Sequence, residues 1–166
     1  MIELSVIRDL VAIFGVIAGL SYYLITVRNQ NRARQAQLLM NIYNALTSSE
    51  VADHEYLLSK VEMKGIEDWR EIQDNREYYR AFNFWFVYYE GIGVLVREGY
   101  VEIGLVAKLL SGNLIWFWER YGEGIINLRR DLNWPRFAIE LEYLYDKVIE
   151  YKERNPDLDI VSPQSI

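Results

Sequence analysis

The feature that most constrains this chain is an uncharged run near its start. Residues 10–27 (LVAIFGVIAGLSYYLITV) contain no charged side chain, and Arg8, Asp9 and Arg28 bound them. Because an α-helix rises about 1.5 Å per residue, this run and its flanks match the roughly 30 Å hydrocarbon thickness of a bilayer. The sequence therefore predicts a transmembrane helix over residues 10–27.

Two other kinds of segment share this pattern. A buried core helix of a soluble protein is one, although core helices are seldom so uniformly apolar over this length. A cleaved signal peptide is the other, and it needs a positive N-terminal region and a small-residue cleavage site. Here Glu3 and Asp9 outnumber Arg8, and no A-x-A pattern follows the run. The run is therefore interpreted as a retained single-pass anchor.

Arginines after the run predict its orientation in the cell membrane. Arg28, Arg32 and Arg34 follow it, and no acidic residue occurs between Arg28 and Glu50. By the positive-inside rule, the C-terminal side is cytoplasmic and the N-terminus lies outside. The three arginines are expected to contact anionic lipid head groups, at about 1 kcal/mol each near the surface.

Two glycines inside the run predict a helix–helix contact. Gly15 and Gly19 form a G-x-x-x-G pattern, and small residues at this spacing let membrane helices approach closely. Self-association through this face is one interpretation. The other is that glycine is simply frequent in membrane helices.

The rest of the chain is predicted to form one all-α cytoplasmic domain, since it lacks the bounded alternation of apolar and polar residues that strands require. The chain has 18 basic and 24 acidic residues, and four of the basic and two of the acidic residues precede residue 35. Residues 35–166 therefore carry a net charge of −8. The negative charge of anionic lipid is expected to repel this acidic domain from the membrane surface. Residues 1–34 are assigned to the anchor and its basic juxtamembrane segment, 35–155 to the helical domain and 156–166 to a disordered tail.

Helical periodicity and capping signals divide the domain into about five or six helices. The membrane helix is expected to continue through residue 46, and the capping-box pattern Thr47–Glu50 predicts a new helix that runs to Lys64. Further helices are predicted over residues 66–72, 76–98, 101–110 and 113–132, and from Pro135 to Arg154.

Cap and turn residues predict where these helices begin and end. Asp74-Asn75 offers an N-cap to the helix over 76–98, and Gly99 is expected to end it. Ser111-Gly112 is expected to separate the next two helices, and the pair Gly122 and Gly124 to kink or break the second. The helix over 76–98 is apolar on nearly every side, which indicates the central helix of a bundle.

The absence of cysteine and the presence of one histidine, His54, exclude several chemistries. Disulfides, cysteine-based zinc sites, thiol catalysis and mechanisms with two histidines are ruled out. A four-helix di-metal site needs two Glu-x-x-His motifs, and Val51 stands three residues before His54. We expect no metal, no cofactor and, at a net charge of −6, no nucleic-acid partner. His54 lies between Asp53 and Glu55 and is expected at an exposed helix position.

Glu90, inside the apolar helix over 76–98, is the leading candidate for a buried polar site. A buried unpaired carboxylate is costly, so Glu90 is expected to pair with Arg97 or Arg120, or to be protonated. Glu119 completes the candidate set. A structural ion pair and a catalytic carboxylate in an apolar pocket both remain open. No G-x-S-x-G, Walker or His-Glu-x-x-His motif occurs, and no catalytic residue is assigned.

Short segments spread over most of residues 10–150 form a recognisable series: Arg32–Leu39 after the anchor, Gly91–Val96, Gly99–Val101, Leu110–Gly112, Trp118-Glu119, and Phe137 with Glu142–Tyr145. In this order they resemble a family of small prokaryotic, often archaeal, membrane-anchored helical proteins of unknown function. The resemblance implies the architecture described above. It implies no activity, because the family has no catalytic residues to carry over.

Three functional hypotheses remain at this point. The first is a non-enzymatic interaction or regulatory module at the inner membrane face, with membrane lipid and either a protein partner or a second copy as its partners. The second is a membrane-tethered enzyme or ligand-binding bundle that uses Glu90. The third is an accessory subunit of a larger membrane complex. Missing catalytic motifs, the anchor and the many aromatic residues favour the first, and exposed tryptophan or tyrosine on the domain would support it.

Overall fold

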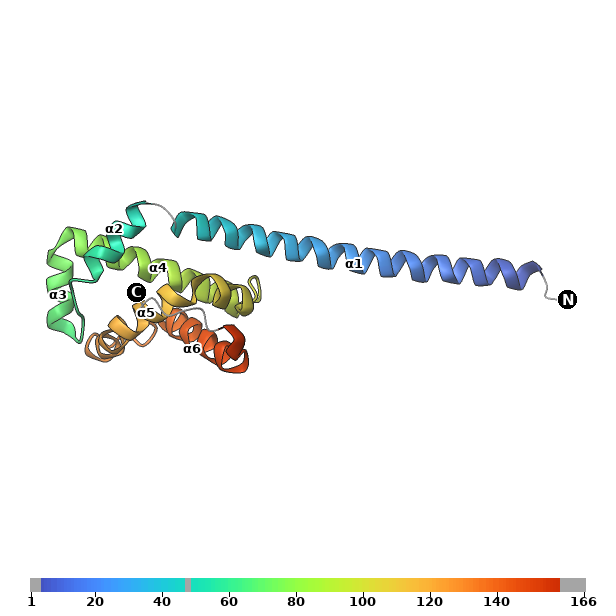
Figure 1. Cartoon of the computed structure of the whole chain (residues 1–166). Helices are drawn as coiled ribbons and strands as arrows, with labels where there is room; N and C mark the ends of the chain where they lie inside the picture. The colour runs from blue at the N-terminus through green and yellow to red at the C-terminus, as the bar shows by residue number, and fades with distance from the viewer. Residues whose placement is uncertain (1–3, 47–48, 159–166) are drawn as a thin grey trace. The chain divides into compact units, whose positions relative to one another are not determined.

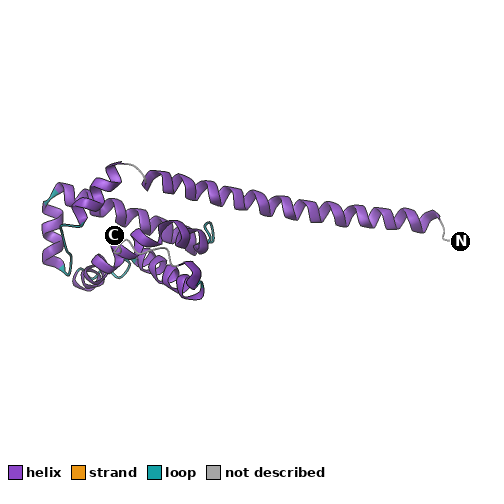
Figure 2. Cartoon of the chain, viewed as in Figure 1, coloured by secondary structure: helices purple, strands orange, loops and turns teal. Residues whose placement is uncertain are grey.

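The computed structural model describes residues 4–46 and 49–158, and every regular element within them is a helix (Figures 1 and 2). The elements are α1 (Leu4–Leu46), α2 (Ser49–Leu58), α3 (Ile66–Asp74), α4 (Arg76–Arg97), α5 (Ile103–Asp131), α6 (Ile139–Arg154) and the short 3-10 helix η1 (Pro156–Leu158). The all-α prediction is confirmed. Residues 47 and 48 of the expected capping box, and residues 159–166 of the expected tail, lie outside the described residues.

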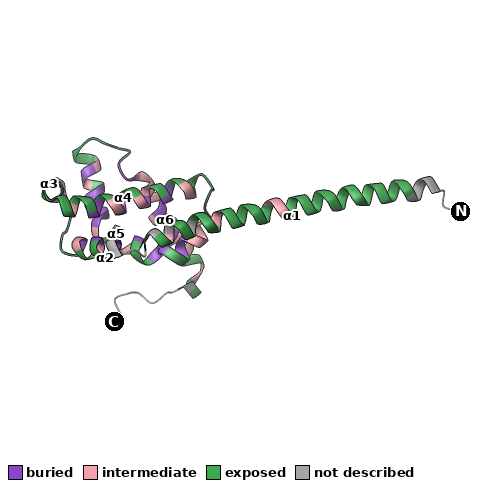
Figure 3. Cartoon of the chain, turned by 90° about the horizontal axis from the view of Figure 1, so that it is seen from above, coloured by how far each residue is buried: buried purple, intermediate pink, exposed green. Residues whose placement is uncertain are grey.

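The chain divides into two compact units, Met1–Leu38 and Leu39–Ile166. The first unit holds most of α1. Its segment Arg8–Leu38 is the one described helix long and apolar enough to cross a membrane. None of the most apolar part of this segment is buried, and most of it is exposed (Figure 3). The prediction of an N-terminal helix that could span a membrane is confirmed at this level, by length and composition.

The second unit is built around α4, which contacts α2, α3, α5 and α6, as expected of a central bundle helix. Its core is aromatic. Phe82, on α4, lies 5.6 Å from Phe117 and 5.5 Å from Tyr121, both on α5, between ring centroids. Trp85 and Tyr89 follow on α4 and stack at 5.3 Å. All five side chains are at most 1% exposed, so the aromatic residues of α4 and α5 fill the centre of the domain.

Both predicted ends of α4 are confirmed. The side chain of Asn75 accepts hydrogen bonds from the backbone N–H groups of Glu77 (3.0 Å) and Tyr78 (3.2 Å), as an N-cap residue does. At the other end Gly99 adopts φ +73°, and the N–H of Tyr100 donates to the carbonyl of Leu95 at 2.9 Å. This is a Schellman motif, in which glycine takes the left-handed position without a Cβ clash.

The predicted break at Ser111-Gly112 is wrong, because α5 is one helix of 29 residues. Leu110 and Leu114 flank the expected break, and both are buried, at 3% and 0% exposure. A continuous apolar stripe packed on the core outweighs the weak helix propensity of serine and glycine. The helix also continues through Gly122 and Gly124.

Gly124 marks a close contact between α5 and another segment. A Cβ at this position would lie 2.1 Å from the carbonyl oxygen of Met63. Met63 belongs to the segment between α2 and α3, and its side chain is fully buried. The absence of a side chain on α5 therefore lets this segment lie against the helix.

Helix α2 ends at Leu58, six residues before the predicted end at Lys64. The segment that follows has carbonyl groups without helical partners, and α5 supplies donors to them. Arg120 donates from Nε to the carbonyl of Val61 (3.0 Å) and from Nη2 to that of Ser59 (2.7 Å). The Tyr121 hydroxyl donates to the carbonyl of Leu58 at 2.6 Å. Side chains far along the sequence thus satisfy carbonyl groups that the predicted longer helix would have paired within itself.

Helix α6 begins at Ile139 and not near Pro135. Between the helices the chain turns, and Asn133 (φ 50°) and Ala138 (φ 59°) adopt left-handed conformations. The N–H of Trp134 donates to the carbonyl of Arg129 at 3.0 Å, so α5 also ends in a Schellman motif, with asparagine in place of glycine. The start of α6 then lies beside α4, where two of the candidate polar residues, Glu90 and Arg97, reach it.

Candidate functional site

Glu90 caps the N-terminus of α6. Ala138 occupies the N-cap position and has no side-chain acceptor. Oε2 of Glu90, on α4, accepts the N–H of Leu141 at 2.8 Å, where an N-cap side chain would normally accept. Burial raises the pKa of Glu90, although backbone hydrogen bonds at Leu141 and Glu140 work in the opposite direction. A carboxylate from another helix therefore satisfies the free N–H at this helix end and faces its positive dipole.

Two arginines complete the junction of α4, α5 and α6. Arg97 Nε donates to Oε2 of Glu140 at 2.6 Å, and its guanidinium lies 3.8 Å from the ring centroid of Tyr143. Arg129 Nη1 donates to Oε2 of Glu142 at 2.6 Å, and its Nε donates to the carbonyl of Phe137 at 2.9 Å. Each charged group is thus paired across a helix boundary, and these contacts fix the first turn of α6.

Gly93 brings the α4 and α6 backbones together at the same junction. A Cβ on Gly93 would lie 2.2 Å from the carbonyl oxygen of Glu140, a distance that no real side chain tolerates. Gly91, two residues earlier, is exposed and would have nothing within 4 Å of its Cβ. The two glycines of the Gly91–Val96 segment therefore have different roles, and only Gly93 is required by packing.

The structure separates the four residues of the predicted buried polar site. Glu90 and Arg97 both reach the first turn of α6, but they bind different partners there. Arg120 lies on α5 and binds the carbonyl groups of the α2–α3 segment. Glu119 is exposed, and its charge contributes to raising the pKa of Tyr145, after the larger effect of burial. The four side chains do not gather around one cavity in the part of the chain that is described.

The predicted membrane-surface and association residues all lie on α1. Arg28, Arg32 and Arg34 are exposed, and none of them has a hydrogen bond or an ion pair to another described residue. Gly15 and Gly19 are exposed as well, and a Cβ at either would have nothing within 4 Å. These five residues are therefore accessible to solvent within their own unit.

His54 is buried, at 6% exposure, and the prediction of an exposed position is wrong. Its ring packs on Phe84 at 5.1 Å, and its Nδ1 has no hydrogen-bond partner. His54 lies on the same face of α2 as the buried residues Val51 and Leu58, at the spacing i, i+3 and i+7. The acidic neighbours Asp53 and Glu55, on which the prediction was based, lie on other sides of the helix. Among the described residues, no three His, Cys, Asp or Glu side chains lie close enough to hold a metal ion.

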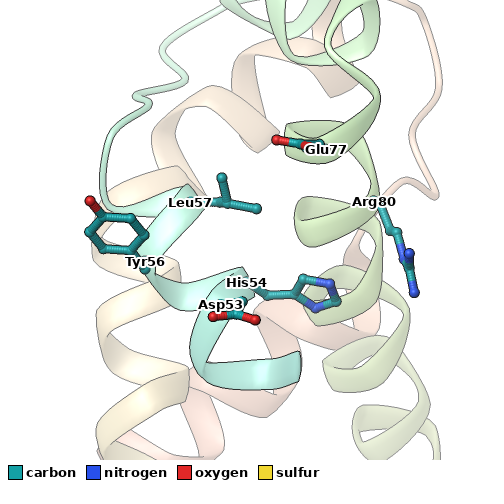
Figure 4. Close-up of a pocket in the computed structure, with 6 residues that line it drawn as sticks. All are labelled: Asp53, His54, Tyr56, Leu57, Glu77 and Arg80. Atoms are coloured by element: carbon teal, nitrogen blue, oxygen red, sulfur yellow. The ribbon is translucent and has the colours of Figure 1, made fainter. Parts of the chain in front are cut away.

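A shallow pocket of about 380 Å³ opens between α2 and the start of α4. Its lining residues are Asp53, His54, Tyr56, Leu57, Glu77 and Arg80. Figure 4 shows His54 and Glu77 directed into the space between the two helices, with Tyr56 on the outer side of α2 and the guanidinium of Arg80 directed away along α4. The polar groups do not converge on one point, as a specific small-molecule site requires.

A second polar group lies between α2, α4 and α5, and the sequence analysis missed it. Nδ2 of Asn113 donates to Oε1 of Glu55 at 2.6 Å, and burial raises the pKa of Glu55. Burial also raises the pKa of Tyr89, with a further contribution from the charge of Glu55, and the Tyr89 hydroxyl has no hydrogen-bond partner. Glu55 and Asn113 are 58 residues apart. No local spacing could have indicated their contact.

The comparisons with known proteins identify a family. No curated protein and no solved structure matches the chain. The model of a domain of unknown function, DUF4760, matches residues 9–148. This range includes the whole apolar run and ends inside α6. Since the match covers most of the sequence, the chain belongs to the DUF4760 family.

Proposed function

We propose that this chain is a membrane-anchored helical module with a cytoplasmic domain, which acts by binding or regulating a partner rather than by catalysis. The observation that carries the proposal is the exposure of α1. Its apolar segment is 0% buried, so nothing in its own unit removes these side chains from water. Exposed apolar surface of this extent marks a membrane or a protein interface. A single continuous helix satisfies its own backbone hydrogen bonds, as a bilayer demands.

The charges around the segment support one orientation. Arg28, Arg32 and Arg34 follow the apolar run, and their guanidinium groups have no protein partner among the described residues. This leaves them available to lipid phosphates on the cytoplasmic side. The family match begins at residue 9 and takes in the run, which supports a retained anchor over a removed signal peptide. The resemblance to prokaryotic, often archaeal, proteins would place this anchor in a prokaryotic cell membrane.

The contacts of Glu90 favour a binding module over an enzyme. Its carboxylate accepts the N–H of Leu141, and the pocket described above is lined by other residues. The structure thus gives this carboxylate a capping role and no place in the pocket. The domain also exposes tyrosines on α2, on α4 and after α4: Tyr56 (63%), Tyr79 (40%) and Tyr100 (63%). Exposed tyrosine is typical of protein-binding surfaces.

Membrane extraction and cysteine labelling test the anchor and its orientation. The chain contains no cysteine, so single-cysteine variants report one position each. We expect the protein to stay in membranes at alkaline pH. In intact cells, a membrane-impermeant maleimide is expected to label Ser5→Cys. It is expected to label Gln73→Cys, at an exposed position of α3, only after lysis. Release of the protein by alkaline carbonate would refute the anchor, and the reverse labelling pattern would refute the orientation.

Site-specific photo-crosslinking tests the binding function. A photoreactive residue in place of Tyr56, Tyr79 or Tyr100 is expected to form a discrete protein adduct in native membranes. The same residue in place of Lys108, exposed on α5, serves as the matched surface control. Equal adducts at all four positions, or none at the three tyrosines, would contradict a specific protein-binding surface.

A further inference from the structure

The turn after α5 exposes a tryptophan. Trp134 is 55% exposed and Leu132 is 45% exposed, and Pro135 between α5 and α6 is exposed as well. The other four tryptophans of the chain are buried or half-buried. Ile126, 46% exposed, lies one helical turn before Arg130 on the same face of α5. Several apolar side chains are therefore open to solvent at this end of α5.

The turn holds Trp134 in a fixed orientation. The N–H of Trp134 donates to the carbonyl of Arg129 at 3.0 Å, and its own carbonyl accepts the N–H of Phe137 at 3.0 Å. The indole packs on the ring of Phe137 at 5.1 Å, and this ring stacks on Phe86 of α4 at 5.0 Å. Backbone hydrogen bonds and a buried aromatic platform thus hold an exposed indole outward, so little ordering entropy remains to be lost when it binds.

The same turn is basic in an acidic domain. Residues 129–136 contain three arginines and one aspartate. Arg129 is paired with Glu142, and Arg130 lies 3.3 Å from Asp131. Arg136 is exposed and has no ion pair within the described part of the chain. An exposed indole with cationic neighbours matches the side chains that sit at the membrane–water interface, where an aromatic ring is half in the apolar layer and arginine meets phosphate.

We propose that the turn Leu132–Arg136 is a second membrane contact, which places Trp134 at the head-group level of the anionic bilayer that holds α1. The proposal rests on the proposed function, since α1 must bring the domain to a membrane. The tether makes docking intramolecular, so that even an affinity in the millimolar range gives substantial occupancy. Repulsion of the acidic domain by the lipid is screened beyond about 8 Å at physiological salt, whereas the turn acts at contact distance.

The turn after α4 is a natural control, because it has the same geometry and the opposite charge. Tyr100 occupies the same position of a Schellman motif as Trp134 and is 63% exposed. Its neighbours include Glu98 and Glu102. A helix of 29 residues, about 43 Å long, separates the two turns. Lipid is therefore expected to contact one turn and not the other.

Fluorescence quenching by brominated phospholipid tests the proposal on the full chain in anionic vesicles. All five tryptophans lie after residue 68, so α1 itself contributes no signal. We expect brominated lipid to quench up to about one fifth of the wild-type emission, the share of one tryptophan in five. Trp134→Phe keeps the ring contact with Phe137 and is expected to lose this quenching, and Arg136→Glu to weaken it. Tyr100→Trp in the Trp134→Phe background adds an exposed indole that should remain unquenched.

The outcomes separate this inference from the proposed function. Wild-type protein that resists alkaline extraction but shows no quenching would overturn the second contact and leave the anchor intact. Failure to integrate into vesicles at all would overturn the anchor and the inference together. Equal quenching at Tyr100→Trp would show contact without selectivity for the basic turn, and would refute the proposal. A photo-crosslink from position 134 to a protein, without quenching, would assign the turn to a protein partner instead.

Discussion

Substitution of Gly93 by alanine is the sharpest test of the packing between α4 and α6. The added Cβ would lie 2.2 Å from the oxygen and 2.6 Å from the carbon of the Glu140 carbonyl. Both atoms belong to the backbone of α6 and cannot rotate away as a flexible side chain could. Relief of the clash requires the two helices to separate by about 1.3 Å, since an ordinary contact between carbon and a neighbouring atom is about 3.5 Å.

The separation is costly because these helices share the main interface of the domain. It would stretch the 2.8 Å hydrogen bond from Leu141 to Glu90 and the 2.6 Å contact between Arg97 and Glu140. Overpacking costs about 1–3 kcal/mol, and more where backbone must move. Alanine regains up to about 1 kcal/mol of helix propensity over glycine. We expect Gly93→Ala to lower the free energy of unfolding by about 2 kcal/mol net.

Gly91→Ala is the matched control for this variant. Gly91 lies on the same helix, is exposed, and would have nothing within 4 Å of its Cβ. Its replacement is expected to raise stability by about 0.5–1 kcal/mol. The assay is urea unfolding of the full chain in detergent, followed by tryptophan fluorescence from the domain. If Gly93→Ala is as stable as Gly91→Ala, the close approach of the two backbones is refuted.

Three further predictions concern polar contacts, each measured by the same urea assay. Asn75→Ala is expected to cost about 1 kcal/mol through loss of the N-cap of α4, and an unchanged midpoint would contradict this. Glu90→Ala is expected to cost about 1–3 kcal/mol because it leaves the N–H of Leu141 unsatisfied, whereas Glu90→Gln keeps an acceptor and should lose much less. Burial raises the pKa of Glu55 and of Glu90, so the folded chain binds protons more readily than the unfolded chain. Stability is then expected to fall as the pH rises from about 4.5 through the folded pKa values, and Glu55→Gln should flatten this slope.

Sequence patterns located the helices where a local signal existed. The N-cap at Asn75 and the C-terminal glycine at Gly99 are confirmed to the residue, because both motifs are made by contacts within five positions. The apolar run before Arg28 was recognisable for a similar reason, since span length and the absence of charge are properties of consecutive residues. Local chemistry decides such features, and tertiary packing only has to be compatible with them.

Sequence patterns failed where a distant segment changes the local preference. Ser111-Gly112 has the composition of a break, yet burial on both sides keeps α5 intact. The helix that ends at Leu58 is predicted to continue to Lys64, yet Arg120 and Tyr121, about sixty positions later, bind carbonyl groups of this segment outside a helix. His54 has acidic neighbours, yet its own face of α2 is covered by α4. The first two errors have one cause, a partner that no window of sequence contains. The error at His54 has another, because its alignment with Val51 and Leu58 on one helix face is visible in the sequence.

Three charged residues inside the domain have a common use that bears on its function. Glu90 caps α6, Arg120 binds the carbonyl groups between α2 and α3, and Arg129 binds the carbonyl of Phe137 before α6. In each case a charged side chain satisfies backbone groups where a helix begins or ends, which a bundle with short, irregular connections needs. These three side chains therefore have a structural role at the ends of helices. Other features of the chain have no such structural role, and they lie at the surface. They are the apolar face of α1, its unpaired arginines, and the exposed aromatic turns at the two ends of α5. Selection for function is therefore expected to act on these surfaces, and substitutions there should change membrane or partner binding while leaving the urea midpoint unchanged.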